Sequence, residues 1–343
     1  MEEGGVSLVR KKTRNILIIV ACVILILAGA WYLARAPEGY AGPVVSLTIG
    51  MPPIEYSALI YIADDRHYFS DNGLDVTIKK YDAGLYAVNG LLAGETDMAL
   101  ATEYVLAGKS LDNASVTALG NIDAFENIFF IARKDRGIST PADLKGKKIG
   151  VPRQTSAEFF LGRYLNLHGI SLDEVTIVDQ KPQQLKDALM NKDVDAVVIW
   201  EPFATPITDQ LGENASAWPA QSGQYAYWLV ISNRSWAADH PSTIERFWRA
   251  LLLAEAYAQS DPAGARAIVV KKTGYDPVLL EKVWPREHFT LSLDQGLILA
   301  MEDESRWMMK NNLTSARQMP NYLDYLDGKG LGSVRPGAVS IIR

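Results

Sequence analysis

The sequence predicts an α/β protein built from two similar lobes that face each other across a cleft. A helix, a tight turn and a short apolar strand follow one another in Leu185–Phe203, and the same succession occurs in Leu91–Leu100. The strand begins at an aspartate in both cases, at Asp195 and at Asp97. Short runs of apolar, β-branched residues are typical of buried parallel strands. Because one helix–strand unit occurs twice, we expect two α/β layers of the same design.

The strand of the second unit ends on Trp200-Glu201-Pro202. Proline lacks the N–H that a central strand needs, so the chain leaves the sheet at this point. An aromatic ring and a carboxylate therefore stand at the carboxyl end of a strand, which is where open α/β sheets bind ligands. We expect binding residues at this edge of the sheet.

The composition is that of a folded protein with room for two domains. The chain has 343 residues, of which 48% are hydrophobic and 22% charged, and its net charge is −6. The first 36 residues are basic, so the remainder is more acidic than the chain as a whole. An acidic globular part argues against nucleic acid, whose phosphates require a basic surface. We expect the partner to be a small molecule.

The N-terminal part carries an uncharged apolar stretch, Ile16–Leu33. Its length is close to the ~20 residues that span a bilayer. Basic residues just before it predict a cytoplasmic segment at 1–15, a transmembrane anchor at 16–33 and a tether at 34–43, which leaves the globular part outside the cytoplasm at the cell membrane. The alternative is a secreted protein, because Ala28-Gly29-Ala30 has the form of a signal-peptide cleavage site. The only cysteine, Cys22, lies in this stretch, so we expect no disulfide in the globular part.

Each lobe is predicted from short apolar runs that end at turn-forming residues. We expect the first lobe at 44–135, the second lobe at 136–228 and a return to the first lobe at 229–343. The predicted elements of the first lobe are a helix at 56–69 and strands at 44–50, 76–81, 97–101, 116–119 and 127–133. Those of the second lobe are strands at 148–152, 175–178 and 195–200, a helix from 155 and a helix at 182–190. A strand at 225–231 returns the chain, and helices from 242 and at 263–272, 277–284 and 293–310 pack on the first lobe.

Several passages carry a family resemblance. Predicted strands lead into a Gly-x-Pro sequence at Gly50 and at Gly150. Two further segments that resemble passages of a known family are Tyr68–Val76 and Ser139–Gly146. In this order, and with Trp200-Glu201-Pro202, they resemble the substrate-binding proteins of ABC importers of the nitrate, sulfonate and taurine type, over about residues 46–326.

The resemblance implies a type II periplasmic-binding-protein fold, with two mixed-sheet lobes joined by a two-strand hinge near Ile131–Gly137 and Ala226–Ser232. It also implies a small anionic or zwitterionic solute of the sulfonate, taurine, nitrate or bicarbonate class. The expected partners are ABC permease and ATPase subunits, with no cofactor and a monomeric state.

The candidate site residues stand at strand ends and helix starts that face the predicted cleft. In the first lobe they are Pro53, Ile54, Tyr56, Gly84, Tyr86, Thr102 and Glu103, and in the second lobe they are Arg153, Gln154, Thr155, Ser156, Trp200 and Glu201. Thr155 and Ser156 begin a helix, where free amides and the helix dipole favour anions. Arg153 adds a forked donor for a sulfonate or carboxylate. If Glu103 or Glu201 faces the ligand, a zwitterion such as taurine fits better than nitrate.

Two alternatives remain open for the charged candidates. Arg153 would point outward if it pairs with Glu158, and an exposed pair of this kind contributes only ~0–1 kcal/mol. Glu201 would be structural if it caps a neighbouring helix.

The sequence favours binding without turnover. The four histidines, His67, His168, His240 and His288, are scattered without metal-ligand spacing, and no Gly-x-Ser-x-Gly motif occurs. A related enzyme branch that makes the thiamine pyrimidine uses a cysteine-rich motif, which the globular part lacks. The other alternative is a membrane-anchored sensor that binds the same solute, and nothing in the sequence separates it from an importer subunit.

Overall fold

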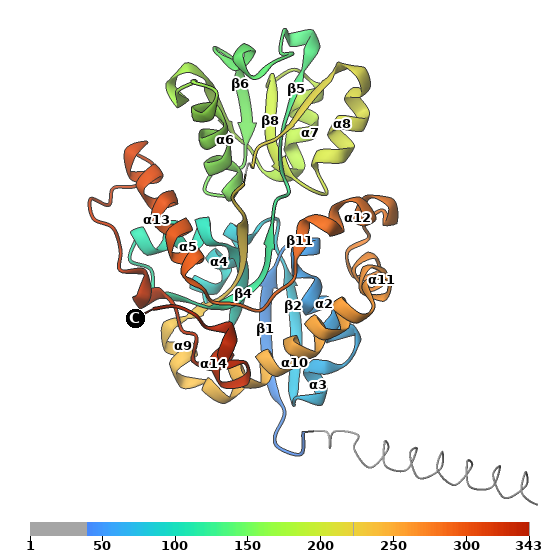
Figure 1. The fold of residues 1–343 in the computed structure, drawn as a ribbon, viewed down its shortest axis with the longest axis vertical. Coiled ribbons are helices and arrows are strands. Elements are labelled where there is room, and N and C mark those ends of the chain that lie inside the picture. Colours follow the sequence, from blue (N-terminus) through green and yellow to red (C-terminus); the bar gives the residue numbers. More distant parts are fainter. Residues whose placement is uncertain (1–39, 222, 343) are drawn as a thin grey trace, which may run out of the picture. The chain divides into compact units, whose positions relative to one another are not determined.

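Two mixed β-sheets organise the chain, one in each lobe (Figure 1). The computed structural model describes residues 40–221 and 223–342. The first sheet has the order β11-β4-β10-β3-β1-β2 and the second has the order β7-β6-β8-β5-β9. The strands of the first sheet are β1 (Val45–Met51), β2 (Leu74–Lys80), β3 (Met98–Thr102), β4 (Val116–Phe125), β10 (Ala226–Asn233) and β11 (Glu287–His288). Those of the second are β5 (Ile128–Arg133), β6 (Lys148–Val151), β7 (Thr176–Asp179), β8 (Ala196–Trp200) and β9 (Ala215–Pro219). The predicted two-lobed α/β architecture is confirmed.

The repeated helix–strand unit builds the same parallel core in each sheet. In the first sheet β1 pairs in parallel with β2 and β3, and in the second sheet β6 pairs in parallel with β7 and β8. The aspartate that precedes β3 accepts a hydrogen bond from β1, from Thr48 N–H to Asp97 Oδ2 at 2.8 Å. Asp195 does the same before β8, where it accepts from Lys148 N–H at 2.9 Å. The repeated aspartate therefore ties the start of β3 to β1 and the start of β8 to β6.

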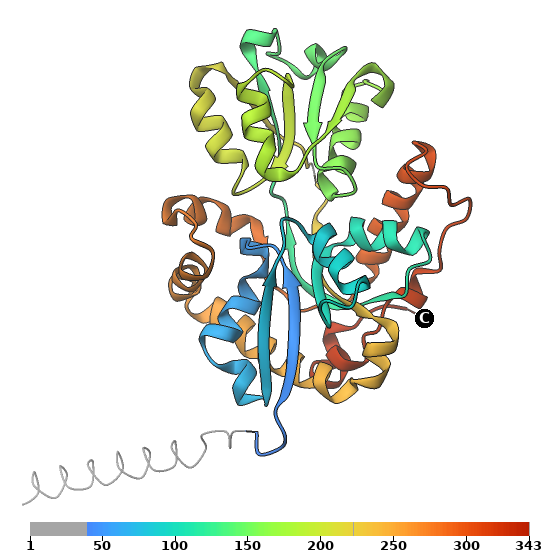
Figure 2. The ribbon, with the colours of Figure 1, turned by 180° about the vertical axis from the view of Figure 1, so that it is seen from behind.

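Helices cover both sheets, and the C-terminal helices pack on the first lobe (Figures 1 and 2). In the first lobe the predicted helix at 56–69 is broken, because His67 adopts a left-handed conformation with φ 62°. The helices are α2 (Ala58–Asp65), α3 (Tyr68–Asp71), α4 (Gly84–Leu92), α5 (Glu103–Leu111), α6 (Ser156–Leu167), α7 (Pro182–Met190), α8 (Ala204–Leu211), α9 (Arg234–Asp239), α10 (Pro241–Ser260), α11 (Pro262–Thr273), α12 (Pro277–Val283), α13 (Gln295–Lys310) and α14 (Lys329–Val334), and the 3-10 turn η1 (Glu55–Ser57) precedes α2.

The two crossings between the lobes lie earlier in the chain than predicted. Strand β5 pairs with β8 and β9, so the chain has joined the second sheet by Ile128, before the predicted boundary at 135 and the hinge at Ile131–Gly137. Strand β10 belongs wholly to the first sheet, so the return precedes Ala226 rather than residue 229. The apolar run in β5 marks a buried strand, but its sheet is decided by pairing with residues far away in the chain.

A glutamine joins the two crossings to each other. The side-chain carbonyl of Gln221 accepts from the N–H groups of Asn127 and Ile128, at 2.6 and 2.9 Å. Its amide nitrogen donates to Phe125 O at 3.0 Å. The hinge is therefore a hydrogen-bonded pair of segments at Phe125–Ile128 and near Gln221.

The predicted membrane anchor at 16–33 lies outside the described residues. Within the part of the chain that the structure describes, none of the helices has the length and apolar character needed to cross a bilayer. Residues 42–343, which contain both lobes, form one compact unit.

Candidate functional site

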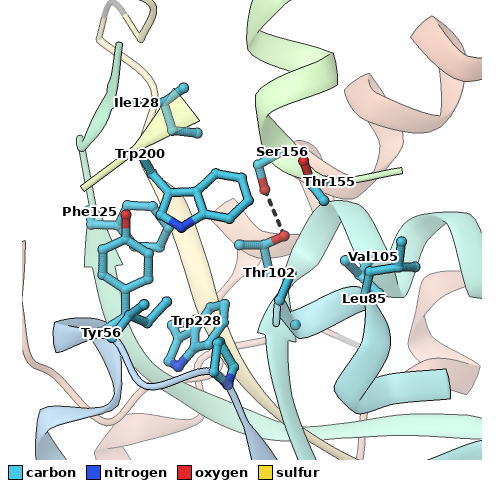
Figure 3. A pocket seen from close by; sticks show the side chains of 14 residues that line it. Tyr56, Leu85, Thr102, Val105, Phe125, Ile128, Thr155, Ser156, Trp200 and Trp228 are labelled. Carbon is cyan, nitrogen blue, oxygen red and sulfur yellow. Dashed lines mark hydrogen bonds between the residues drawn. The ribbon is translucent and has the colours of Figure 1, made fainter. Parts of the chain in front are cut away.

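A pocket with an empty volume of about 400 Å³ lies between the two lobes (Figure 3). The first lobe contributes the segment after β1, the start of α4, the end of β3 and the aromatic residues of β4 and β10. The second lobe contributes the start of β5, the start of α6 and the end of β8. The fourteen lining residues are Pro52, Ile54, Tyr56, Ala83, Gly84, Leu85, Thr102, Val105, Phe125, Ile128, Thr155, Ser156, Trp200 and Trp228.

The structure brings part of the predicted site together in this pocket. The predicted residues that line it are Ile54, Tyr56, Gly84, Thr102, Thr155, Ser156 and Trp200. They converge because strand ends and helix starts of both lobes meet at the same cleft. Gly84 has a packing reason as well, since a Cβ atom there would lie 2.8 Å from the Cα of Ala101 in β3. Any larger residue would push α4 away from the sheet.

Arg153 and Gln154 lie outside this pocket and line a second, outer hollow between the lobes. Arg153 Nε donates to Glu158 Oε1 at 2.7 Å, and Gln154 N–H donates to Glu158 Oε2 at 2.8 Å. Glu158 is buried, and 42% of the arginine side chain is exposed. The structure thus places Arg153 in the alternative arrangement, paired with Glu158, and the forked anion donor is not aimed into the pocket.

Three of the other predicted residues outside the pocket have partners within the protein. Glu201 accepts from Thr205 N–H at 2.9 Å and from Thr205 Oγ1 at 2.6 Å, so it caps α8. Glu103 is fully buried and accepts from Tyr227 N–H at 2.9 Å. Tyr86 lies under Lys181 of the other lobe, with Nζ 5.4 Å from the ring centre, and Pro53 does not reach the pocket.

Sequence reasoning found Tyr56 but missed Phe125 and Trp228, the other two rings of an aromatic wall in the first lobe. Tyr56 stacks on Phe125 with ring centres 3.8 Å apart and meets Trp228 edge-on at 5.5 Å. The indole N–H of Trp228 donates to Ser57 Oγ at 3.0 Å, which fixes its ring. Phe125 and Trp228 sit in apolar strands, and their sequence pattern is that of ordinary core residues. Ile128 in β5 was missed for the same reason, and the other lining residues that were not predicted are Pro52, Ala83, Leu85 and Val105.

The polar groups of the pocket are hydrogen-bond donors and hydroxyls. Helices α4 and α6 point their first turns at it from opposite lobes. The amides of Leu85, Ser156 and Ala157 take part in no hydrogen bond among the described residues. The hydroxyl of Ser156 donates to Thr102 Oγ1 at 2.6 Å across the cleft. The indole N–H of Trp200 also faces the pocket (Figure 3).

None of the fourteen lining residues is charged. Free helix amides with a positive dipole end, in a lining without charged side chains, favour an anion. A hydroxyl pair with no imidazole or carboxylate in the lining is not an activated nucleophile. The chemistry of the pocket therefore favours binding an anion over covalent catalysis.

Buried carboxyl groups lie behind the Tyr56–Phe125 stack. We call Glu55, Asp123 and Glu287 the acid cluster, and all three side chains are buried. Burial raises the pKa of Glu55 to about 8 and that of Asp123 to about 7. Burial, together with the charges of the other two carboxyls, raises the pKa of Glu287 well above its usual value.

Hydrogen bonds tie the acid cluster to the first crossing. The side-chain nitrogen of Asn127, Nδ2, donates to Glu55 Oε1 at 2.6 Å and to Glu287 Oε1 at 3.1 Å. The hydroxyl of Tyr275 donates to the other carboxyl oxygen of Glu55. Raised pKa values favour the protonated, uncharged form of these carboxyls. The wall behind the pocket therefore repels an anion less than three ionised carboxylates would.

The family model described as NMT1/THI5 like matches residues 55–265. The chain is similar to the taurine-binding periplasmic protein of Escherichia coli, with 24% identity over 235 residues that cover 65% of this chain and 69% of that protein. It is also 26% identical over 227 residues, 61% of this chain and 65% of the other, to the 4-amino-5-hydroxymethyl-2-methylpyrimidine phosphate synthase of Aspergillus parasiticus. Among solved structures, the alkanesulfonate-binding protein SsuA of Xanthomonas axonopodis pv. citri, bound to MOPS, shares the fold. Its TM-score is 0.73 at 19% identity, and the match covers 84% of this chain and 99% of that one.

Proposed function

Because the chain belongs to the NMT1/THI5-like family, we propose that it is the solute-binding protein of an ABC importer and captures a small organic sulfonate. The observation that carries the proposal is the meeting of two helix starts, from α4 and α6 in opposite lobes, at one pocket without charged side chains. A sulfonate group offers three oxygens as acceptors, which suit several amide and indole donors at once. The names of the taurine-binding and alkanesulfonate-binding relatives point to the same class of ligand.

The lining of the pocket favours a sulfonate with an apolar body. Trp228, Phe125 and Ile128 supply apolar surface in the same pocket as the helix starts. The pocket contains no carboxylate to pair with the ammonium of taurine, and burying an unpaired charge is costly. Nitrate and bicarbonate have no apolar part to cover this surface. We therefore place alkanesulfonates above taurine and both above the inorganic anions.

Isothermal titration of the purified full-length protein tests this order of ligands. We expect propane-1-sulfonate to bind at least about tenfold more tightly than taurine, and nitrate and bicarbonate to bind more weakly still. Propane-1-sulfonamide has nearly the same shape without the negative charge and serves as the matched control that should not bind. Tighter binding of taurine than of propane-1-sulfonate would contradict the apolar-body assignment, and binding of none of the sulfonates would contradict the function.

The same proposal places the globular part outside the cytoplasm, held at the membrane by residues 16–33. Its support is the basic segment before this apolar stretch and the periplasmic location in the name of the Escherichia coli relative. We expect the full-length protein to stay in the membrane pellet after carbonate extraction, with its N-terminus intact. Protease added to spheroplasts should degrade the globular part. A mature chain that begins at Trp31 in the soluble fraction would instead show cleavage of a signal peptide.

A further inference from the structure

A tryptophan of the C-terminal part contacts a glycine in the middle of a helix of the other lobe. Gly162 lies within α6, where glycine is a poor choice because of its backbone freedom. A Cβ atom at this position would lie 2.7 Å from Cε2 and 2.8 Å from Nε1 of Trp307 in α13. The indole therefore rests directly on the backbone of α6, and only glycine leaves room for it.

Aromatic side chains from both lobes extend this contact. Trp307 meets Phe159 of α6 edge-on, with ring centres 5.6 Å apart and an interplanar angle of 89°, and it lies 6.3 Å from the ring of Tyr104 in α5. The hydroxyl of Tyr104 donates to the buried Glu158 of α6 at 3.2 Å. We call Tyr104, Phe159, Gly162 and Trp307 the aromatic latch. It joins α5 and α13 of the first lobe to α6 of the second, away from the two crossings.

The latch acts on the helix whose first turn faces the pocket. Ser156 begins α6, and Phe159 and Gly162 follow within two turns of the same helix. A contact that holds Gly162 on α13 also holds Ser156 against Thr102, to which its hydroxyl donates. Trp307 itself does not line the pocket, so its influence on a ligand passes through the position of α6.

We propose that Trp307 is a positioning residue that keeps the two lobes closed over the ligand, through its contact with Gly162. This inference rests on the proposed binding function for its effect on affinity, but its effect on lobe opening does not. In a protein that opens and closes, the measured affinity is the affinity of the closed form reduced by the fraction that is closed. Weakening the latch should lower that fraction and speed ligand release.

The test compares the ligand-free wild type with Trp307→Ala by small-angle X-ray scattering. We expect a larger radius of gyration for the variant. With propane-1-sulfonate as the probe, we expect affinity about tenfold lower, with most of the change in the dissociation rate. Trp307→Phe should restore part of the affinity, since a smaller ring still packs on Gly162. A residue that served stability alone would lower the melting temperature without opening the lobes.

Two further variants complete the design. Gly162→Ala retains the indole and places a methyl group in its way, so it should open the lobes as Trp307→Ala does. If Trp307→Ala does not fold, Gly162→Ala provides the same test. Trp236→Ala is the matched control, because that tryptophan stacks on His240 within the first lobe, with ring centres 4.4 Å apart. It should leave the scattering curve and the affinity unchanged.

The outcomes are distinct. Unchanged scattering in both latch variants, with affinity within twofold of the wild type, overturns the inference. In another outcome, the wild type binds no sulfonate while Trp307→Ala still has a larger radius of gyration without ligand. That result would contradict the proposed function but would support the role of Trp307 in holding the lobes closed.

Discussion

Replacing Trp200 with alanine is expected to weaken binding of propane-1-sulfonate by about a hundredfold. The residue ends β8, lies in the pocket wall and directs its indole N–H into the pocket. A buried tryptophan at the centre of a binding site typically carries such a share of the affinity, through lost apolar contact and a lost donor. Calorimetric titration measures the effect, and the melting temperature without ligand shows whether the variant is folded.

Two further variants are needed to interpret the effect of Trp200→Ala on the affinity. Trp200→Phe retains an aromatic ring without the N–H and should lose about tenfold, which separates the donor from the apolar surface. Arg153→Ala is the control, since Arg153 pairs with Glu158 outside the pocket, and it should change the affinity less than about threefold. If Arg153→Ala weakened binding more than Trp200→Ala, the anion would sit in the outer hollow and the assignment of the pocket would be wrong.

The folded protein is expected to lose stability as the pH rises from 5 to 8.5. Burial raises the pKa of Glu103 and of Glu55 to about 8, and that of Asp123 to about 7, from unfolded values near 4. The folded state therefore binds more protons than the unfolded state across this window, and stability falls with rising pH. Each pKa unit corresponds to about 1.4 kcal/mol, so the free energy of unfolding should drop by several kcal/mol.

Denaturant unfolding at pH 5, 6.5 and 8.5 measures this dependence. Carboxyls with lowered pKa values, such as Asp65 and Asp143, lose their contribution only at lower pH and do not offset it. Glu103→Gln retains the acceptor for Tyr227 N–H but does not ionise, so its stability should vary less with pH. Stability that rises between pH 5 and 8.5 would show that the buried carboxyls are ionised in the folded state.

The sequence predicts the position of some residues near the site and not that of others. The local sequence alone predicts the position of Trp200. An apolar strand that ends before a proline places its last side chain at the edge of the sheet. Thr155 and Ser156 are placed by the helix that begins there. Arg153 shows the limit of such reasoning, since a cation beside a helix start is equally compatible with a ligand and with an internal partner.

The sequence by itself determined the two-lobed α/β plan and the helix starts and strand end that face the cleft. These features depend on local periodicity and on turn residues, and the repeated Asp97 and Asp195 act between adjacent strands. The tertiary structure decided which sheet β5 joins, that Phe125 and Trp228 form a pocket wall, and that Trp307 rests on Gly162. Each of these depends on pairing between residues far apart in the chain, and an apolar residue has the same sequence pattern whether it fills a core or lines a cavity.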